Sequence, residues 1–272
     1  MYRHILMKLD EKKIVVAWDL DETLGCFVEL GMLWDALNKF SSQKLTDSDF
    51  FKLLDAYPMF LRPDIMKILK LLKNKKKSNR NLMVIVFTNN QGPESWAEMI
   101  VKYFNHKLKY KLFDTIIPAY KVDGKQISTC RTSHEKKYED LLACLKLPKG
   151  TPVCFIDDQE HNQMKKDDVH YILIKQYELS LSFGSMLERL KDSGLAKSFG
   201  VESEVTMQRM REFLEEYDMT VRLRSKRELD IDKVITKKLY NHIQSFLKEH
   251  IKKHNKTRRN VTRSFKKTFK IF

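Results

Sequence analysis

Five short apolar runs, rich in β-branched and aromatic residues, constrain the fold of this chain more than any other feature. They are Ile14–Trp18, Leu82–Phe87, Thr115–Pro118, Pro152–Ile156 and His170–Ile174. Most are continuous rather than alternating, which is typical of strands buried on both faces of a parallel sheet. Apolar residues at helical spacing lie between the runs. The alternation predicts an α/β fold with a doubly wound parallel sheet, in which ligands bind beyond the carboxyl ends of the strands.

The same patterns divide the chain into parts. The predicted parts are an α/β domain at 1–197 with a small helical insertion at about 25–60 after the first strand, a helical extension at 198–247 and a basic tail at 248–272. Residues 120–128 are expected to form a hairpin that turns at Asp123-Gly124, and residues 73–81 a basic loop. No strand is expected after about Ser198.

The positive charge of the chain is concentrated at its C-terminal end. Lys and Arg number 51 against 36 Asp and Glu, a net charge of +15, and residues 248–272 hold ten of these cations and one acid, Glu249. Such a tail attracts nucleic acid or another acidic partner, and Phe265, Phe269 and Phe272 between the lysines could stack on bases. A targeting signal, a membrane-surface segment and a solubilising tail are the alternatives.

Composition excludes several classes of protein. A hydrophobic fraction of 42% is enough for a sizeable core and excludes wholesale disorder. No apolar run approaches the roughly 20 residues of a membrane span, and the N-terminal residues lack the apolar segment of a secretory signal, so a cytoplasmic or nuclear protein is expected. The four cysteines, Cys26, Cys130, Cys144 and Cys154, have no paired-ligand spacing, so neither a disulfide nor a structural zinc site is expected.

Carboxylates and a hydroxyl follow three of the predicted strands. Asp19 and Asp21 come after the first strand, Thr88 after the second, and Asp157 and Asp158 after the fourth. Carboxylates this close repel one another unless a cation lies among them, and their oxygens are ligands that Mg²⁺ prefers. One carboxylate could then attack a phosphoryl group, and a second, two residues along, could act as general acid and base. The hydroxyl and a lysine could stabilise the phosphoryl oxygens.

These segments resemble the motifs of the haloacid dehalogenase (HAD) superfamily. Val16–Leu24 is similar to motif I, Phe87–Asn90 to motif II and Phe155–Asp158 to motif IV. Within the superfamily, the Asp-Leu-Asp-Glu-Thr-Leu run and Leu61-Arg62-Pro63 before a helix resemble the phosphatases that act on the C-terminal domain of RNA polymerase II (the FCP/SCP type), including the short members encoded by large DNA viruses. The likeness covers about residues 12–190.

The resemblance implies a role for each matched residue. The catalytic residues would be Asp19 as nucleophile, Asp21 as general acid and base, Thr88 and Lys136. The phosphate-binding residues would be Thr88, Asn89 and Lys136. The ligands of a Mg²⁺ cofactor would be Asp19, the backbone carbonyl of Asp21, and Asp158, with Asp157 beside them.

The motif lysine has two candidates. Residues 132–135 (Thr-Ser-His-Glu) match a capping box, which predicts a helix that begins there and carries Lys136 and Lys137 in its first turn. The spacing to the double Asp, as in the family, favours Lys136, and Lys137 is the alternative. His134 and His161 are both expected at the surface.

Three departures from the polymerase-tail phosphatases concern the substrate. Gly25-Cys26 follows motif I, the stretch up to Leu61 is helical rather than β-rich, and Gln159-Glu160-His161 follows motif IV. The expected function is that of a Mg²⁺-dependent phosphomonoester hydrolase with an aspartyl-phosphate intermediate. Its substrate would be a phosphorylated macromolecule, with protein phosphoserine or phosphothreonine preferred. The alternatives are a polynucleotide 3′-phosphatase, whose motif the Thr88–Gly92 run resembles, and a nucleic-acid-binding scaffold that uses the basic tail.

Overall fold

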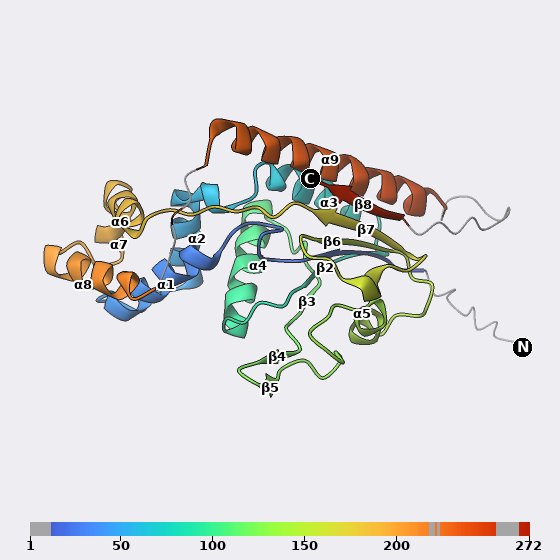
Figure 1. Ribbon diagram of the computed structural model, residues 1–272, viewed down its shortest axis with the longest axis horizontal. Coiled ribbons are helices and arrows are strands. Elements are labelled where there is room, and N and C mark those ends of the chain that lie inside the picture. The colour runs from blue at the N-terminus through green and yellow to red at the C-terminus, as the bar shows by residue number, and fades with distance from the viewer. Residues whose placement is uncertain (1–11, 218–220, 222–223, 254–266) are drawn as a thin grey trace, which may run out of the picture.

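The computed structural model describes residues 12–217, 221, 224–253 and 267–272, and its core is a parallel sheet (Figure 1). Six strands lie in the order β3-β2-β1-β6-β7-β8, and every neighbouring pair is parallel. The strands are β1 (Ile14–Trp18), β2 (Leu82–Phe87), β3 (Thr115–Ile117), β6 (Val153–Asp157), β7 (Val169–Ile174) and β8 (Lys267–Ile271). The prediction of an α/β fold with a parallel sheet is confirmed.

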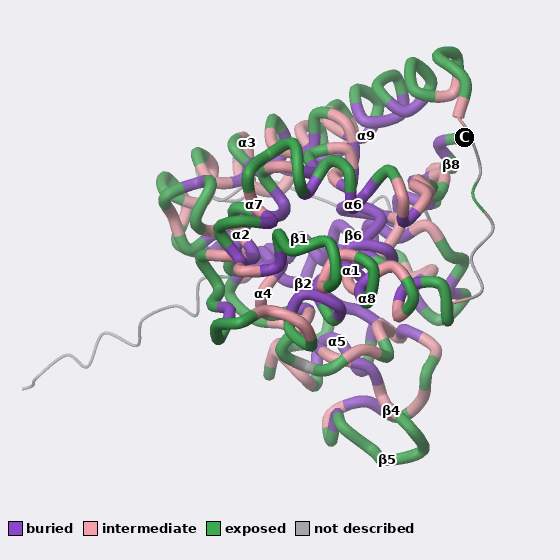
Figure 2. The backbone as a smooth tube through the Cα atoms, turned by 90° about the vertical axis from the view of Figure 1, so that its left-hand side faces the viewer, coloured by how far each residue is buried: buried purple, intermediate pink, exposed green. Residues whose placement is uncertain are grey.

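Helices cover both faces of the sheet, which explains why the strand sequences are continuously apolar. Side chains that alternate along β1 enter two separate cores, with Val16 in one and Val15 in the other. The first core packs against α3 (Ile65–Lys77), α4 (Glu94–Leu108) and α9 (Lys226–Lys253), and the second against α5 (Tyr138–Leu145). Figure 2 shows buried segments, in purple, along β1, β2 and β6.

A lobe of helices lies beyond the carboxyl ends of the strands, at the left of Figure 1. It consists of α1 (Val28–Phe40), α2 (Asp47–Ala56), α6 (Phe183–Asp192), α7 (Leu195–Ser198) and α8 (Glu204–Glu215). α1 and α2 form the expected helical insertion after β1. The ring of Phe50 lies edge-on to Trp34 of α1 and to Trp96 of α4, with centroids 5.4 and 5.3 Å apart. These contacts anchor the insertion on the core.

Two 3₁₀ turns and a hairpin lie in the connections between these elements. The 3₁₀ turns are η1 (Pro58–Phe60) and η2 (Asn162–Met164), and the predicted hairpin is formed by β4 (Lys121–Val122) and β5 (Lys125–Gln126). Asp123 and Gly124 both have positive φ, 48° and 75°, as a two-residue hairpin turn requires. None of the helices that the structure describes is long and apolar enough to cross a bilayer.

The C-terminal residues contradict the expectation that strands end by Ser198. β8 pairs in parallel with β7, from His170 opposite Lys267 to Ile174 opposite Ile271. Its Ile271 side chain is 2% exposed and belongs to the larger core. α9 continues to Lys253, so both ends of the predicted basic tail are part of the folded structure.

The three phenylalanines of that tail also differ in whether they belong to the folded structure. The ring of Phe269 stacks on His170 at 4.6 Å and lies 4.5 Å from His242 of α9, so it packs between sheet and helix and is partly buried. Phe272 is 66% exposed. Phe265 and the greater part of the predicted tail lie outside the described residues, where the polyanion-binding role stays a prediction.

Two further expectations are wrong. Residues 73–77 of the expected basic loop belong to α3, where lysines in the last turn complement the helix dipole.

Cys130 and Cys144 form a disulfide, with their Cα atoms 5.0 Å apart, because the chain after the hairpin folds back onto α5. The other two cysteines, Cys26 and Cys154, are free and buried.

Candidate active site

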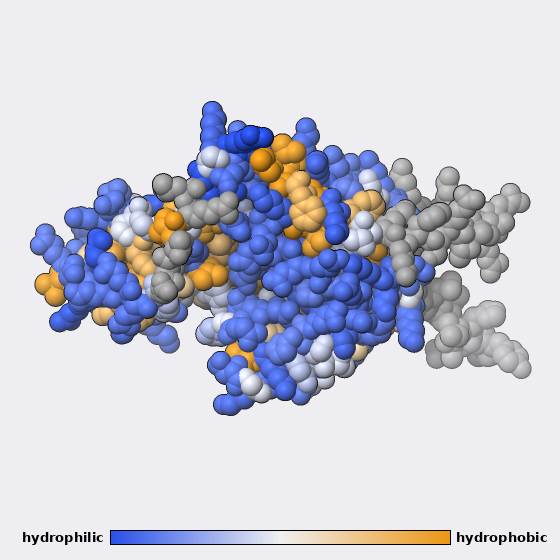
Figure 3. Space-filling view, in the orientation of Figure 1, coloured by the Kyte–Doolittle hydropathy of each residue, from blue (hydrophilic) through white to orange (hydrophobic). Residues whose placement is uncertain are grey.

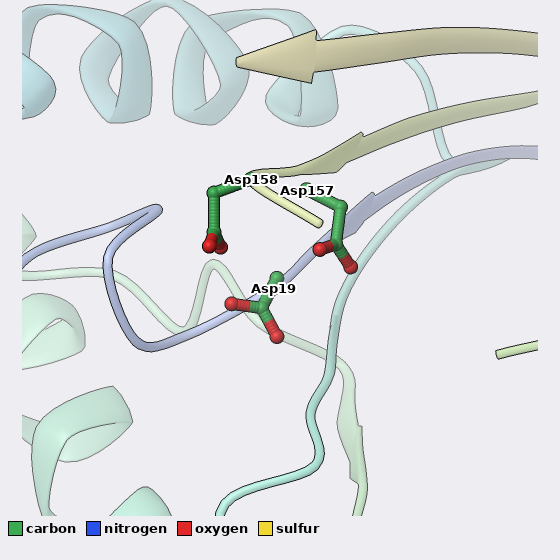
Figure 4. A group of neighbouring side chains, drawn as sticks. All are labelled: Asp19, Asp157 and Asp158. Carbon is green, nitrogen blue, oxygen red and sulfur yellow. The ribbon is translucent and has the colours of Figure 1, made fainter. Parts of the chain in front are cut away.

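Three carboxylates meet where β1 and β6 end, and their side chains project to the same side of these strand ends (Figure 4). These strands are parallel neighbours with Trp18 opposite Ile156, so Asp19 and Asp157 stand side by side at the same edge of the sheet. The backbone N–H of Asp19 donates to the carbonyl of Ile156 at 2.9 Å. One oxygen each of Asp19, Asp157 and Asp158 lie within 4.8 Å of one another. The structure thus brings together three of the predicted metal ligands.

This cluster fits a hard divalent cation such as Mg²⁺. Its donor atoms are carboxylate oxygens, the ligand type that Mg²⁺ prefers, and Asp19 and Asp157 are buried. The Thr23 hydroxyl donates to Asp158 at 2.9 Å and the Gln176 amide at 3.2 Å, which orients this third carboxylate. Burial, and then the charge of Asp157, raise the pKa of Asp158. A cation among these groups would relieve their mutual repulsion.

Lys136 is the cation that the protein itself places in the cluster. Its side chain is 2% exposed, and its ammonium donates to Asp19 and, at 2.7 Å, to Asp157. Burial alone would lower the pKa of Lys136, but Asp157 and Asp19 outweigh burial and raise it, so the amine stays charged. Burial holds the pKa of Asp19 well above its ordinary value, opposed by Lys136 and assisted by Asp157 and Asp158.

Lys136 does not lie in a helix, which corrects the capping-box prediction. α5 begins at Tyr138, and Lys137 is its N-cap residue in an extended conformation. The backbone N–H and the hydroxyl of Thr132 donate instead to the carboxylate of Asp140, at 2.9 and 3.0 Å. The Lys137 ammonium donates to the Thr132 hydroxyl at 2.9 Å. Because neighbouring side chains of an extended chain point to opposite sides, only one of the two lysines enters the cluster.

Asp21 lies in the loop after β1, beside Asn90. The Asn90 side-chain amide donates to Oδ2 of Asp21 at 2.7 Å, and Oδ1 is buried without a hydrogen-bond partner among the described residues. Burial raises the pKa of Asp21, and the bond from Asn90 opposes the rise. Burial, followed by Asp21 and Asp158, raises the pKa of the next residue, Glu22, to about 7. A carboxyl group with a raised pKa and an unbonded oxygen suits proton transfer near neutral pH.

Arg62 ties the loop after β1 to the rest of the domain. Its guanidinium is buried and donates to the backbone carbonyls of Thr23 at 2.6 Å, of Glu22, and of Lys175 at 2.9 Å. Burial lowers the pKa of Arg62 to about 10, against an opposing influence of Asp232 on α9, so the group is charged at neutral pH. Three carbonyl bonds from one planar group fix the loop relative to the end of β7.

Thr88 and Asn89 line a cleft over the carboxylate cluster, the candidate catalytic cleft, which has a volume of about 260 Å³. Its lining also includes Asp19, Asp21, Lys136 and Asp157. The Thr88 hydroxyl accepts the backbone N–H of Asn90 at 3.0 Å, so its own proton can be donated to a ligand. The Asn89 side chain accepts from Arg131 at 2.7 Å and donates to the carbonyl of His134 at 3.0 Å. Its amide therefore shapes the loop, while His134 is exposed, as expected.

Arg131 holds this second loop in place and was missed at the sequence level. It donates to the backbone carbonyls of Thr88 at 3.0 Å and Pro118 at 2.9 Å, and its guanidinium lies 4.8 Å from the centroid of the Phe87 ring. Burial lowers the pKa of Arg131 to about 10. The residue stands in a loop, and the pattern at the residues that follow it predicted only the start of a helix, so no local pattern could have identified it.

His161 is buried, which contradicts its expected place at the surface. Its Nε2 lies 3.5 Å from Oδ2 of Asp157, and its Nδ1 accepts the backbone N–H of Lys136 at 3.4 Å. The Tyr171 hydroxyl accepts the N–H of His161 at 2.9 Å and donates to the carbonyl of Gln159 at 2.6 Å. These bonds turn the chain inward after β6 and bring the imidazole to the floor of the cleft.

No protein-family model and no curated protein matches this chain. Two solved structures are similar to it, both of the HAD domain of the effector protein Lem4 from Legionella pneumophila, one of them an inactive mutant. Each is 12% identical, with a TM-score of 0.35 over 76% of this chain and 95% or 96% of the other. At this level the likeness carries no argument about activity, which the geometry of the site has to supply.

Proposed function

We propose that this protein is a phosphomonoester hydrolase of the HAD type with Asp19 as its nucleophile. The observation that carries the proposal is the position of Lys136, whose buried ammonium bonds both Asp19 and Asp157 in the cleft that Thr88 also lines. A phosphate group carries negative charge on several oxygens, and its transfer needs a fixed cation and hydrogen-bond donors around the reacting carboxylate. Lys136 and Thr88 supply such groups here.

The reaction divides between two carboxyl groups. Asp19 attacks the phosphorus, and the bond from phosphorus to the alcohol oxygen breaks, which leaves an aspartyl phosphate. Asp21 gives its proton to the departing oxygen. As a carboxylate, Asp21 then takes a proton from the water that hydrolyses the aspartyl phosphate and restores Asp19. The bond from Asn90 holds Asp21 in one orientation throughout, and the raised pKa of Asp21 favours its protonated form at the start.

The remaining residues of the site bind and stabilise the transferring group. Lys136 and Thr88 donate to the phosphoryl oxygens, where negative charge accumulates. Mg²⁺, when bound, neutralises charge on the phosphoryl group. The residues that would hold it are Asp19 and Asp158, with Asp157 beside them, and, as the resemblance implies, the backbone carbonyl of Asp21. Arg62 and Arg131 position the two loops that carry Asp21 and Thr88.

A phosphoserine or phosphothreonine of a protein is the substrate that the surroundings of the cleft favour. The helices of the insertion, α1 and α2, pack on α8 and α4, so the cleft is not enclosed by a separate cap among the described residues. Val28 at the rim is 50% exposed. A narrow cleft with an open rim admits a phosphorylated side chain that projects from a large molecule.

Hydrolysis of p-nitrophenyl phosphate tests the proposed chemistry. We expect turnover with Mg²⁺, loss of turnover in EDTA, and loss in the Asp19→Asn variant, which keeps the size of the side chain and removes the nucleophilic oxygen. Asp167→Asn, at an exposed position, is the matched control and should behave as the wild type. Full activity of a folded Asp19→Asn variant would refute the assignment of the nucleophile.

A further inference from the structure

A larger hollow, which we call the edge groove, lies beside the catalytic cleft and has a volume of about 680 Å³. Thr88 and Asn90 line both hollows, so the two are neighbours. One wall of the edge groove is α4, and the other is β3 with the chain that follows it toward the hairpin of β4 and β5. The part of a large substrate next to a group bound at Asp19 would therefore lie close to the edge groove.

The lining of the edge groove is largely apolar. Its apolar side chains include Ala97, Val101, Phe113, Ile116, Val122 and Ile127. Ile127 is 42% exposed and belongs to neither of the two cores. Figure 3 shows hydrophobic atoms, in orange, at the surface beside the hairpin of β4 and β5. Exposed apolar surface in a concave site is typical of a binding surface.

The charges of the edge groove balance. Two acidic and two basic residues line it, namely Glu98, Asp114, Lys102 and Lys111. Lys102 is paired with Asp47 at 3.0 Å, and Asp114 with Lys76 at 2.7 Å. A nucleic-acid strand needs an excess of cations along its phosphates, which this surface does not offer. An apolar, charge-balanced groove favours a polypeptide.

The backbone beside the groove is also suited to an extended peptide. β3 is the first strand of the sheet and pairs with β2 alone, so its outer edge offers N–H and C=O groups to another strand. The wall from Ala97 to Asn105 spans eight helical steps, about 12 Å at 1.5 Å per residue. That length matches about four residues of extended chain.

We infer that the edge groove binds the polypeptide next to the phosphorylated residue and selects aliphatic side chains within about four residues of it. The inference rests on the proposed phosphatase function, since it assigns the substrate of the same site. A small ester lacks the neighbouring residues that would occupy the groove, so the groove should affect peptides alone.

Two phosphoserine peptides that differ in these neighbouring residues test the inference. One carries Val and Leu there, and the other Gly and Ser. We expect kcat/KM at least tenfold higher for the aliphatic peptide, mainly through KM, which corresponds to about 1.4 kcal/mol. In the double variant Val122→Asp and Ile127→Asp this preference should fall to less than threefold, while kcat/KM for p-nitrophenyl phosphate is unchanged.

The double variant suits this purpose because neither residue belongs to the two cores. Lys125→Glu in the same hairpin is the matched control: it also changes the net charge by two units, but Lys125 is exposed and lies outside the groove lining, so the preference should persist. Equal kcat/KM for the two peptides, with p-nitrophenyl phosphate hydrolysed, overturns the inference and leaves the proposed function standing. Faster hydrolysis of a 3′-phosphorylated oligonucleotide than of either peptide also overturns it.

Failure of the proposed function gives a different result. In that case wild-type protein hydrolyses neither p-nitrophenyl phosphate nor the peptides. Fluorescence anisotropy of the labelled, unphosphorylated aliphatic peptide then tests the groove directly. Binding that the double variant loses and Lys125→Glu keeps supports the groove as a peptide site, and binding equal to that of the Gly and Ser peptide refutes it.

Discussion

Replacing Lys136 with methionine isolates the electrostatics of the site, because the substitution nearly keeps the length of the side chain and removes its charge. The ammonium donates hydrogen bonds to two buried carboxylates, and its nitrogen lies 2.7 Å from an oxygen of Asp157. At an effective dielectric constant of about 20, charges at this distance attract by roughly 6 kcal/mol, and the dehydration of buried charges cancels part of that. Removing one partner of a buried ion pair costs about 3–5 kcal/mol, which is the loss of unfolding free energy that we expect at pH 7 in EDTA.

The size of this loss should depend on pH. Burial tends to raise the pKa of Asp157, but Lys136 and His161 outweigh burial and lower it below its ordinary 3.8. A carboxyl group whose pKa is lower in the folded state stabilises the protein at pH values above the pKa that the group has in the unfolded state. That stability is lost as the pH falls through the pKa that the group has in the folded state. The difference between wild type and Lys136→Met should therefore be full at pH 7 and shrink below about pH 4.

Urea unfolding and p-nitrophenyl phosphate hydrolysis measure the two consequences. Loss of one donor to the transferring group should lower kcat by about 10²–10³. Lys137→Met is the matched control, since its ammonium bonds the Thr132 hydroxyl outside the cluster, and it should leave both quantities near wild type. The reasoning would be refuted if the unfolding free energy of Lys136→Met were within about 1 kcal/mol of the wild-type value and only Lys137→Met lost activity.

Three other changes test separate parts of the structure. Reducing the disulfide between Cys130 and Cys144, which closes a loop of about 15 residues, should lower the free energy of urea unfolding by about 3 kcal/mol; an unchanged midpoint with reductant would contradict the bond. Ile271→Ala empties a buried position in β8 and should cost about 2–5 kcal/mol, whereas the exposed neighbour Phe272→Ala should cost less than about 0.5 kcal/mol. Equal losses would argue against β8 as a sheet strand. Arg62→Lys keeps a charge but cannot bond three carbonyls with one planar fork, so kcat for p-nitrophenyl phosphate should fall by about 10-fold to 100-fold; an unchanged kcat would show that the loop is held by other contacts.

The strands of the α/β core and the residues after them were predictable because both are local features. A strand covered by helices on both faces has to be apolar along its whole length, and helices between strands make neighbouring strands parallel. Once the strands are parallel, the residues that follow them share one edge of the sheet. Asp19, Thr88 and Asp157 could therefore be placed together from the sequence alone, with no knowledge of the register.

Contacts between distant segments decided the rest. Lys136 and Lys137 are neighbours of the same type, and only the extended backbone before α5 separates the one in the cluster from the one at the surface. Arg131 and His161 entered the site through bonds to backbone groups of other loops, for which a single stretch of sequence has no signal.

β8 is another segment whose structure the local sequence did not decide. From Thr268 to Ile271 polar and apolar residues alternate, a pattern that is compatible with a solvated tail or with an edge strand. The free edge of β7 and the cover of α9 over Phe269 decided in favour of a strand. Local sequence thus determined which segments can be buried and which groups can react. The tertiary structure decided which partner each segment meets, because burial, hydrogen bonding and the balance of charge are completed only by residues far away along the chain.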